Sequence, residues 1–117
     1  MELTDAHCHL QFDRLVDRTD EILKNAQAAD VTRFICVGTN VSDSQKAANI
    51  AAAHKNVWAT VGVHPHDSKN FLEQKDSVAR LKDLLTMPKV VAVGEIGLDF
   101  YKNYSLKLQQ EKLLRLQ

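Results

Sequence analysis

The chain has 117 residues, of which 26% are charged and 44% hydrophobic, and its formal net charge is zero. This composition is typical of one folded domain with its own core and excludes a disordered chain. The balanced charge argues against nonspecific binding to nucleic acid or to a membrane surface, which depends on an excess of lysine and arginine.

The cysteine content and the absence of targeting or membrane patterns indicate where in the cell the protein is expected. Cys8 and Cys36 are the two cysteines, too few for a disulfide framework, and Cys36 lies in an apolar run. We find neither a signal-peptide pattern nor an apolar stretch long enough to cross a bilayer. The sequence therefore predicts a cytoplasmic protein without a membrane segment.

The predicted elements alternate between strands and helices along the chain. Ser42 with Gln45 forms a capping-box pattern at the start of the second helix, and Asp76 or Ser77 is expected to cap the third. Strands are expected to begin at residue 2 and to cover 33–38, 57–63 and 90–95, the second of them buried on both faces. Helices are expected over 17–30, from 42 to about 53, from 76 or 77 to about 87, and from about 105 onward.

This alternation indicates an α/β fold with right-handed βαβ units and parallel strands. An eight-stranded barrel of this kind takes roughly 250 residues, so four βα units in 117 residues amount to about half a barrel. The last helix reaches Gln117 within its apolar pattern and without a stop signal. We therefore expect a single domain over residues 1–117, apparently truncated within its architecture.

Three side chains at predicted strand ends form a candidate metal site. His7 and His9 share one face of the first strand if the extended conformation persists through His9, and Glu95 shares its parity with Val91 and Val93. Carboxyl ends of parallel strands meet at one edge of a sheet. Two imidazoles and a carboxylate suit a first-row divalent ion. The competing interpretations are histidines that merely begin a loop and a salt bridge at the sheet rim.

A second pair of histidines follows the third strand. Pro65 lies between His64 and His66 and restricts the backbone there. These rings are candidates for metal ligands, proton donors or phosphate contacts, and helix capping or loop packing is nearly as good an explanation for His66. Asp99 and Tyr101, after the fourth strand, either orient site groups or form a structural turn.

Three segments together resemble the N-terminal signatures of the TatD-type metal-dependent deoxyribonucleases, which are amidohydrolase-like barrels. They occur in the same order and are Asp5–Leu10, Gly62–His66 and Gly94–Tyr101. The resemblance implies the N-terminal half of a TIM-like (β/α)8 barrel, a divalent-metal centre with two ions in the complete site, and DNA as substrate. It further implies that His7 and His9 bind one ion, that the catalytic Glu95 binds or bridges two, and that His64 and His66 lie near the substrate.

The resemblance leaves two alternatives open. Members of this family take two more histidines and an aspartate from later strands, so the isolated chain is expected to be impaired in hydrolysis. The first-strand ligands would equally serve a barrel hydrolase of a small amide or ester. The other alternative to a nuclease is a noncatalytic half-barrel that self-associates or binds a complementary C-terminal half.

Overall fold

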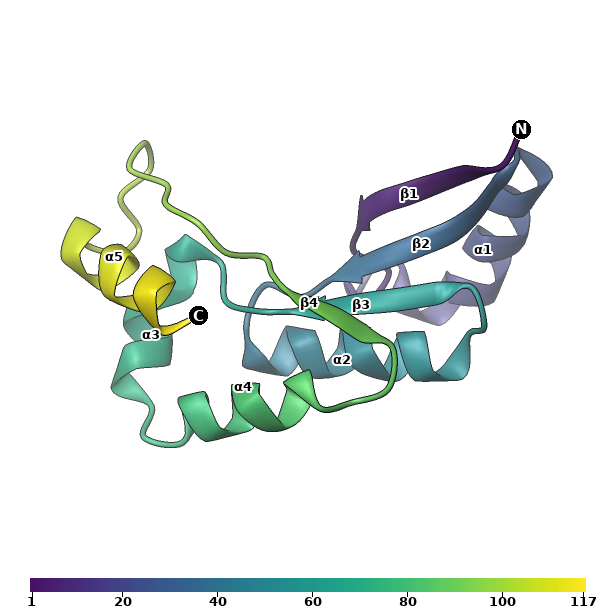
Figure 1. Ribbon diagram of the computed structural model, residues 1–117. Coiled ribbons are helices and arrows are strands. Elements are labelled where there is room, and N and C mark those ends of the chain that lie inside the picture. Colours follow the sequence, from purple (N-terminus) through teal and green to yellow (C-terminus); the bar gives the residue numbers. More distant parts are fainter.

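A computed structural model describes all 117 residues as one parallel sheet with helices packed against it (Figure 1). Short 3-10 turns, η1 and η2, precede two of the helices. The elements in chain order are β1 (Leu3–Cys8), η1 (Val16–Arg18), α1 (Thr19–Ala28), β2 (Val31–Val37), α2 (Val41–Ala53), β3 (Val57–Val61), η2 (Pro65–Asp67), α3 (Ser68–Glu73), α4 (Ser77–Leu85), β4 (Val90–Val93) and α5 (Lys107–Leu116).

The strand order is β1-β2-β3-β4, and each neighbouring pair is parallel. The predicted α/β fold with four parallel strands is therefore confirmed. Figure 1 shows α2 and α4 along the same side of the sheet. None of the helices combines the length and the apolar character needed to cross a bilayer.

The core lies between this side of the sheet and the helices. One cluster joins β1, β2 and β3 to α1 and α2, and a second joins β3 to α2, α3, α4 and α5. Ala47, Ala48 and Ala51 of α2 are fully buried, because small side chains let this helix lie close to the strands. The predicted burial of Cys36 is confirmed, since it belongs to the first cluster.

The other side of the sheet is less covered. Phe34 and Cys36 of β2 are buried in the first core cluster, whereas Arg33 is exposed and Ile35 half-buried. The prediction that β2 is buried on both faces is wrong for Arg33 and Ile35, whereas Val37, which has the same strand parity, is buried.

Several element boundaries differ from the sequence-based ones. Asn40, rather than Ser42, caps α2, because its side-chain oxygen accepts a hydrogen bond from the Asp43 N–H at 2.9 Å. The 17–30 helix is divided into η1 and α1, and the third strand ends at Val61 instead of Val63. The turn η2 and the helix α3 were not predicted, since their three- and six-residue lengths give too little periodicity.

The alternation of side chains between the two faces of the sheet, from which Glu95 was assigned to the face of Val91 and Val93, is interrupted in β4. The pairing of β4 with β3 shifts by one residue between Ala59 and Thr60. Val93 consequently lines a hollow between the helices, whereas Val91 is 54% exposed. The predicted common inner face of Val91, Val93 and Glu95 is wrong, because the shift breaks the period of two and Glu95 lies beyond the strand.

Gly38, directly after β2, is in close contact with α2. A Cβ at this position would lie 2.2 Å from Oγ and 2.6 Å from Cα of Ser44. Ser44 cannot withdraw easily, because its hydroxyl bonds both the carbonyl and the N–H of Gly62, at 3.0 and 3.1 Å.

We predict that Gly38→Ala lowers the free energy of unfolding by about 1–3 kcal/mol, the usual cost of overpacking a tight site. Thermal or urea unfolding measures the change. Ser42→Ala, at an exposed position of the same helix start, is the control and should unfold like the parent chain. Equal stability of the Gly38 variant and the control would contradict the contact.

Candidate metal centre

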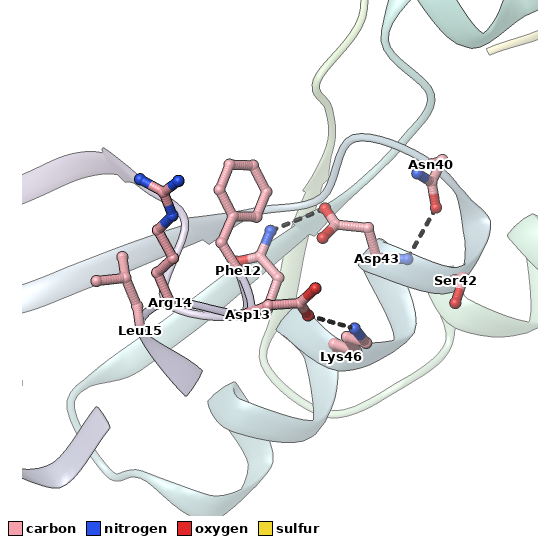
Figure 2. Close-up of a pocket in the computed structure, with 9 residues that line it drawn as sticks. Phe12, Asp13, Arg14, Leu15, Asn40, Ser42, Asp43 and Lys46 are labelled. Atoms are coloured by element: carbon pink, nitrogen blue, oxygen red, sulfur yellow. Dashed lines mark hydrogen bonds and ion pairs between the residues drawn. The ribbon is translucent and has the colours of Figure 1, made fainter. Parts of the chain in front are cut away.

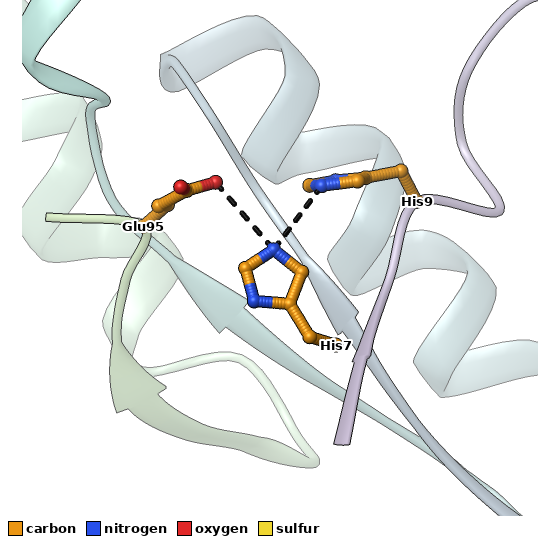
Figure 3. A group of neighbouring side chains, drawn as sticks. All are labelled: His7, His9 and Glu95. Carbon is orange, nitrogen blue, oxygen red and sulfur yellow. Dashed lines mark hydrogen bonds and ion pairs between the residues drawn. The ribbon is translucent and has the colours of Figure 1, made fainter. Parts of the chain in front are cut away.

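Two imidazole rings from the end of β1 and the residue after it meet the carboxylate of Glu95, which follows β4 (Figure 3). Nε2 of His7 lies 3.2 Å from Nε2 of His9 and 3.6 Å from Oε2 of Glu95. One ligand atom from each residue lies within 4.8 Å of the others. The structure thus brings the three candidate ligands together, although the extended conformation of β1 ends at Cys8, before His9.

The two pairs of donor atoms that include His7 are close to the spacing that a metal site needs, and His9 has the matching tautomer. Ligand atoms bonded at about 2.1 Å to a tetrahedral ion are roughly 3.4 Å apart, close to the 3.2 and 3.6 Å gaps found here. Nδ1 of His9 lies 2.8 Å from the Val37 carbonyl oxygen. A carbonyl only accepts, so Nδ1 carries the proton and Nε2 keeps its lone pair for an ion. The site fits a divalent first-row ion.

The end of β2 holds both parts of this site in place. The Val37 carbonyl accepts the His9 hydrogen bond, and the next carbonyl, of Gly38, accepts the backbone N–H of Glu95 at 2.7 Å. On its other side, the ring of His9 stacks on Phe12, with centroids 4.5 Å apart and an angle of 6° between the planes. The orientations of His9 and Glu95 are therefore set by the same two residues of backbone.

The second histidine pair divides between the metal centre and a neighbouring loop. Nδ1 of His64 accepts the backbone N–H of His66 at 3.2 Å, which leaves the proton of the neutral ring on Nε2, 3.7 Å from Oε1 of Glu95. Nε2 of His66 instead lies 2.6 Å from Oδ2 of Asp99. The hydrogen bond from His66 is the main cause that holds the pKa of Asp99 below its usual value. Asp99 therefore combines the two roles left open for it, because Oδ2 contacts His66 while Oδ1 accepts the Tyr101 backbone N–H at 3.0 Å in a local turn.

The family is shown by comparison with known sequences. The sequence model of the family described as "TatD related DNase" matches residues 4–117. This chain belongs to the TatD-related DNase family. The resemblance found in the three sequence motifs is thereby confirmed.

The relatives are proteins named 3'-5' ssDNA/RNA exonuclease TatD. The one from Cronobacter turicensis is 43% identical over 101 residues, which are 86% of this chain and 36% of the relative. The one from Citrobacter rodentium is 37% identical over 113 residues, which are 97% of this chain and 42% of the relative. The chain therefore spans about two fifths of the length of these relatives.

Solved structures of the family likewise match this chain over less than half of their own length. A TatD homologue from Escherichia coli, YJJV, superimposes with a TM-score of 0.87 at 28% identity, over 97% of this chain and 44% of that one. A TatD-family hydrolase from Entamoeba histolytica gives a TM-score of 0.87 at 26% identity, over 98% and 44%. The four βα units of this TatD-family chain correspond to half of a TIM-like barrel, as expected.

Sequence reasoning missed a glutamine that supports the site from α5. Gln110 is fully buried, and its side-chain oxygen accepts the Asp99 N–H at 2.8 Å while its nitrogen donates to the Asp99 carbonyl at 3.0 Å. The same nitrogen donates to the Ser105 carbonyl at 2.9 Å, and the Ser105 hydroxyl donates to the His66 carbonyl at 2.8 Å. A glutamine within an amphipathic helix pattern gives no sequence signal for such a role.

A second missed glutamine follows β1. Gln11 is fully buried and donates from Nε2 to the Val37 carbonyl and to Asp43, both at 2.8 Å. It lies in the wall of a hollow of about 600 Å³ that also contains the Asp13–Lys46 ion pair, whose atoms are 3.4 Å apart (Figure 2). Gln11 thus connects the loop after β1 to the start of α2, next to the carbonyl that orients His9.

Cys8 and His54 lie outside the centre. Sγ of Cys8 donates to the Ile35 carbonyl at 3.4 Å, and its hydrogen bond with Cys36, together with burial, raises the pKa of its thiol. His54 is the C-cap residue of α2, and its side chain is 23% exposed and lies 2.9 Å from Asp20. Nδ1 of this ring also lies 2.9 Å from the Ile50 carbonyl oxygen at the helix end.

We predict that Gln110→Leu, which removes the amide but keeps the volume, loosens the loop between β4 and α5. The backbone groups of Asp99 lose their partners, so the free energy of unfolding should fall by about 1–3 kcal/mol. Amide hydrogen exchange should accelerate over residues 95–105. Lys112→Ala, an exposed change on the same helix, is the control, and unchanged loop exchange in the Gln110 variant would refute the role.

Proposed function

We propose that this chain provides the metal centre of an enzyme that hydrolyses phosphodiester bonds of DNA, with His7, His9 and Glu95 as the ligands. The observation that carries the proposal is the convergence of two imidazole nitrogens and a carboxylate within 4.8 Å. The names of the relatives, ssDNA/RNA exonucleases, support the substrate class. They give no support to a small amide or ester substrate.

A divalent ion bound here supplies Lewis acidity toward a phosphoryl oxygen and a lowered pKa for water. The two carboxylate oxygens of Glu95 face different sides, Oε2 toward His7 at 3.6 Å and Oε1 toward His64 at 3.7 Å. A carboxylate placed in this way suits a bridging role between two ions. His64 presents the N–H of Nε2 to the same space and would donate it to a substrate phosphate.

The complete reaction needs more groups than this chain supplies. This chain spans 36% and 42% of the length of the two relatives described above. Since three residues form its ligand cluster, we assign the ligands that complete a two-ion site to the remaining barrel units of a full-length enzyme. The isolated chain would then bind an ion but hydrolyse DNA poorly.

A role as a half-barrel that associates with a partner is favoured by the open sheet. The edge strands β1 and β4 have neighbours on one side only. Leu3 is 42% exposed and Val91 54% exposed on these two strands. Unpaired strand edges with apolar side chains pair readily with another chain, so a complementary half-barrel or a second copy is the proposed partner.

Removing one ligand should weaken metal binding. We expect His7→Ala and Glu95→Gln each to lower the affinity for Mn²⁺ or Zn²⁺ at least about tenfold. Mutation of a residue that only hydrogen-bonds to a metal ligand already reduces metal affinity by about that factor. Titration calorimetry of the 117-residue chain gives the affinities. Asp20→Asn, a carboxylate change on α1, is the matched control. Parent-like affinity in both ligand variants would exclude this site.

The edge strands lead to a second expectation. In sedimentation velocity, the purified chain should show a sedimentation coefficient that rises with concentration, because unpaired edges and exposed apolar groups favour association. Val91→Lys, a charge placed on the edge strand β4, should shift the distribution toward monomer. A single monomeric species at all concentrations would contradict the association.

A further inference from the structure

The loop between β4 and α5, together with the first residue of α5, exposes aromatic side chains and lysines side by side. Tyr101 is 91% exposed, Tyr104 65% and Phe100 38%. Nζ of Lys102 lies 5.9 Å from the ring centroid of Tyr104, and Nζ of Lys107 lies 5.0 Å from that of Phe100. Aromatic rings next to lysines are the combination that proteins use to hold single strands, with bases on the rings and phosphates on the cations.

This surface is built on a fixed support. Gln110 bonds both backbone groups of Asp99 and the carbonyl of Ser105. Ser105 is 3% exposed and bonds the backbone of His66 and Lys69. The loop is therefore anchored near both of its ends, and its aromatic side chains project from an anchored backbone instead of packing into the core.

The two lysines are free to meet an anion. Neither Lys102 nor Lys107 forms an ion pair in the structure. The nearby carboxylate of Asp99 is taken by Nε2 of His66 at 2.6 Å. The ammonium groups of Lys102 and Lys107 therefore lie unpaired beside the aromatic rings.

A continuous series of contacts joins the loop to the candidate metal centre. Glu95 faces His64 at 3.7 Å, and the ring centroids of His64 and His66 are 4.4 Å apart. The ring of Tyr104 meets that of His66 edge-on, with centroids 4.8 Å apart. A strand whose phosphate lies at Glu95 and His64 would therefore reach Tyr104 within the length of a few nucleotides.

We infer that residues 100–107 form a binding strip for single-stranded nucleic acid that leads into the metal centre. Bases stack on Tyr101 and Tyr104, and the backbone phosphates contact Lys102 and Lys107. This inference rests on the proposed function and gives it a strand preference, because bases in a duplex are stacked on each other and cannot offer their faces to the rings.

The test measures binding of an oligothymidylate of 12 nucleotides to the 117-residue chain in EDTA, so that the metal centre takes no part. Tyr101→Ala and Tyr104→Ala should each weaken binding roughly five- to hundredfold, the range found for loss of one stacking side chain. Tyr104→Phe keeps the ring and should stay within about twofold of the parent. Leu108→Ala, an exposed apolar change on α5, is the control.

Salt dependence and NMR give independent readouts. Lys102→Ala and Lys107→Ala should each reduce the slope of log affinity against log salt by about 0.7, the value for one phosphate contact to a single strand, whereas Lys24→Ala on α1 should not. The chain has two tyrosines and one tryptophan. The ring signals of Tyr101 and Tyr104 should shift on binding, and those of Trp58 on β3 should not.

The outcomes separate this inference from the proposed function. Absence of oligothymidylate binding, equal binding of a 12-base-pair duplex, or parent-like affinity of both tyrosine-to-alanine variants would overturn the strip, even if the chain binds metal. Protection of the tyrosines by an added complementary half-barrel, with loss of oligonucleotide binding, would assign the surface to that partner instead. Failure of metal binding with intact oligonucleotide binding would overturn the metal centre and leave the strip.

Discussion

Two consecutive carbonyl groups at the end of β2 hold the candidate metal centre together. The Val37 carbonyl fixes the ring of His9, and the Gly38 carbonyl fixes the backbone of Glu95. These two ligands are far apart in the sequence, and no direct hydrogen bond joins them. Their common reference is a strand of the sheet, so the precision of the site depends on how firmly β2 is held.

Packing around β2 supplies that firmness. Gly38 lies against Ser44 of α2 so closely that a Cβ would meet it at 2.2 Å, and the Ser44 hydroxyl is bonded in turn to the backbone of Gly62. Gln11 adds a further hydrogen bond to the Val37 carbonyl. The fully buried alanines of α2 allow this close approach of helix and sheet. Core packing and ligand geometry are thus parts of one arrangement.

The second histidine pair extends the site in a different direction. Because η2 turns directly after His64, His64 and His66 point to different partners, Glu95 and Asp99. The first contact belongs to the metal centre, and the second connects η2 to the loop that Gln110 holds. Helix α5 therefore acts on the site from a distance, through the backbone of Asp99.

The sequence by itself determined the parallel α/β architecture, the strand ends that carry the histidines, and the family. Periodicity and strand-end position are local properties, so His7, His9, His64 and Glu95 could be proposed without coordinates. The sequence alone did not determine the register shift in β4 or the cap at Asn40. Strand register and helix capping each depend on which of several possible hydrogen bonds forms in the folded chain.

Only the tertiary structure decided which backbone groups meet the ligands and which polar side chains support them. Gln11 and Gln110 look like ordinary polar residues in the sequence, yet both are fully buried and each bonds backbone beside the site. A glutamine amide can satisfy a carbonyl and an N–H of any segment that packs against it. Which segment that is depends on the distance between elements in space, and this distance is fixed by the packing of the whole domain.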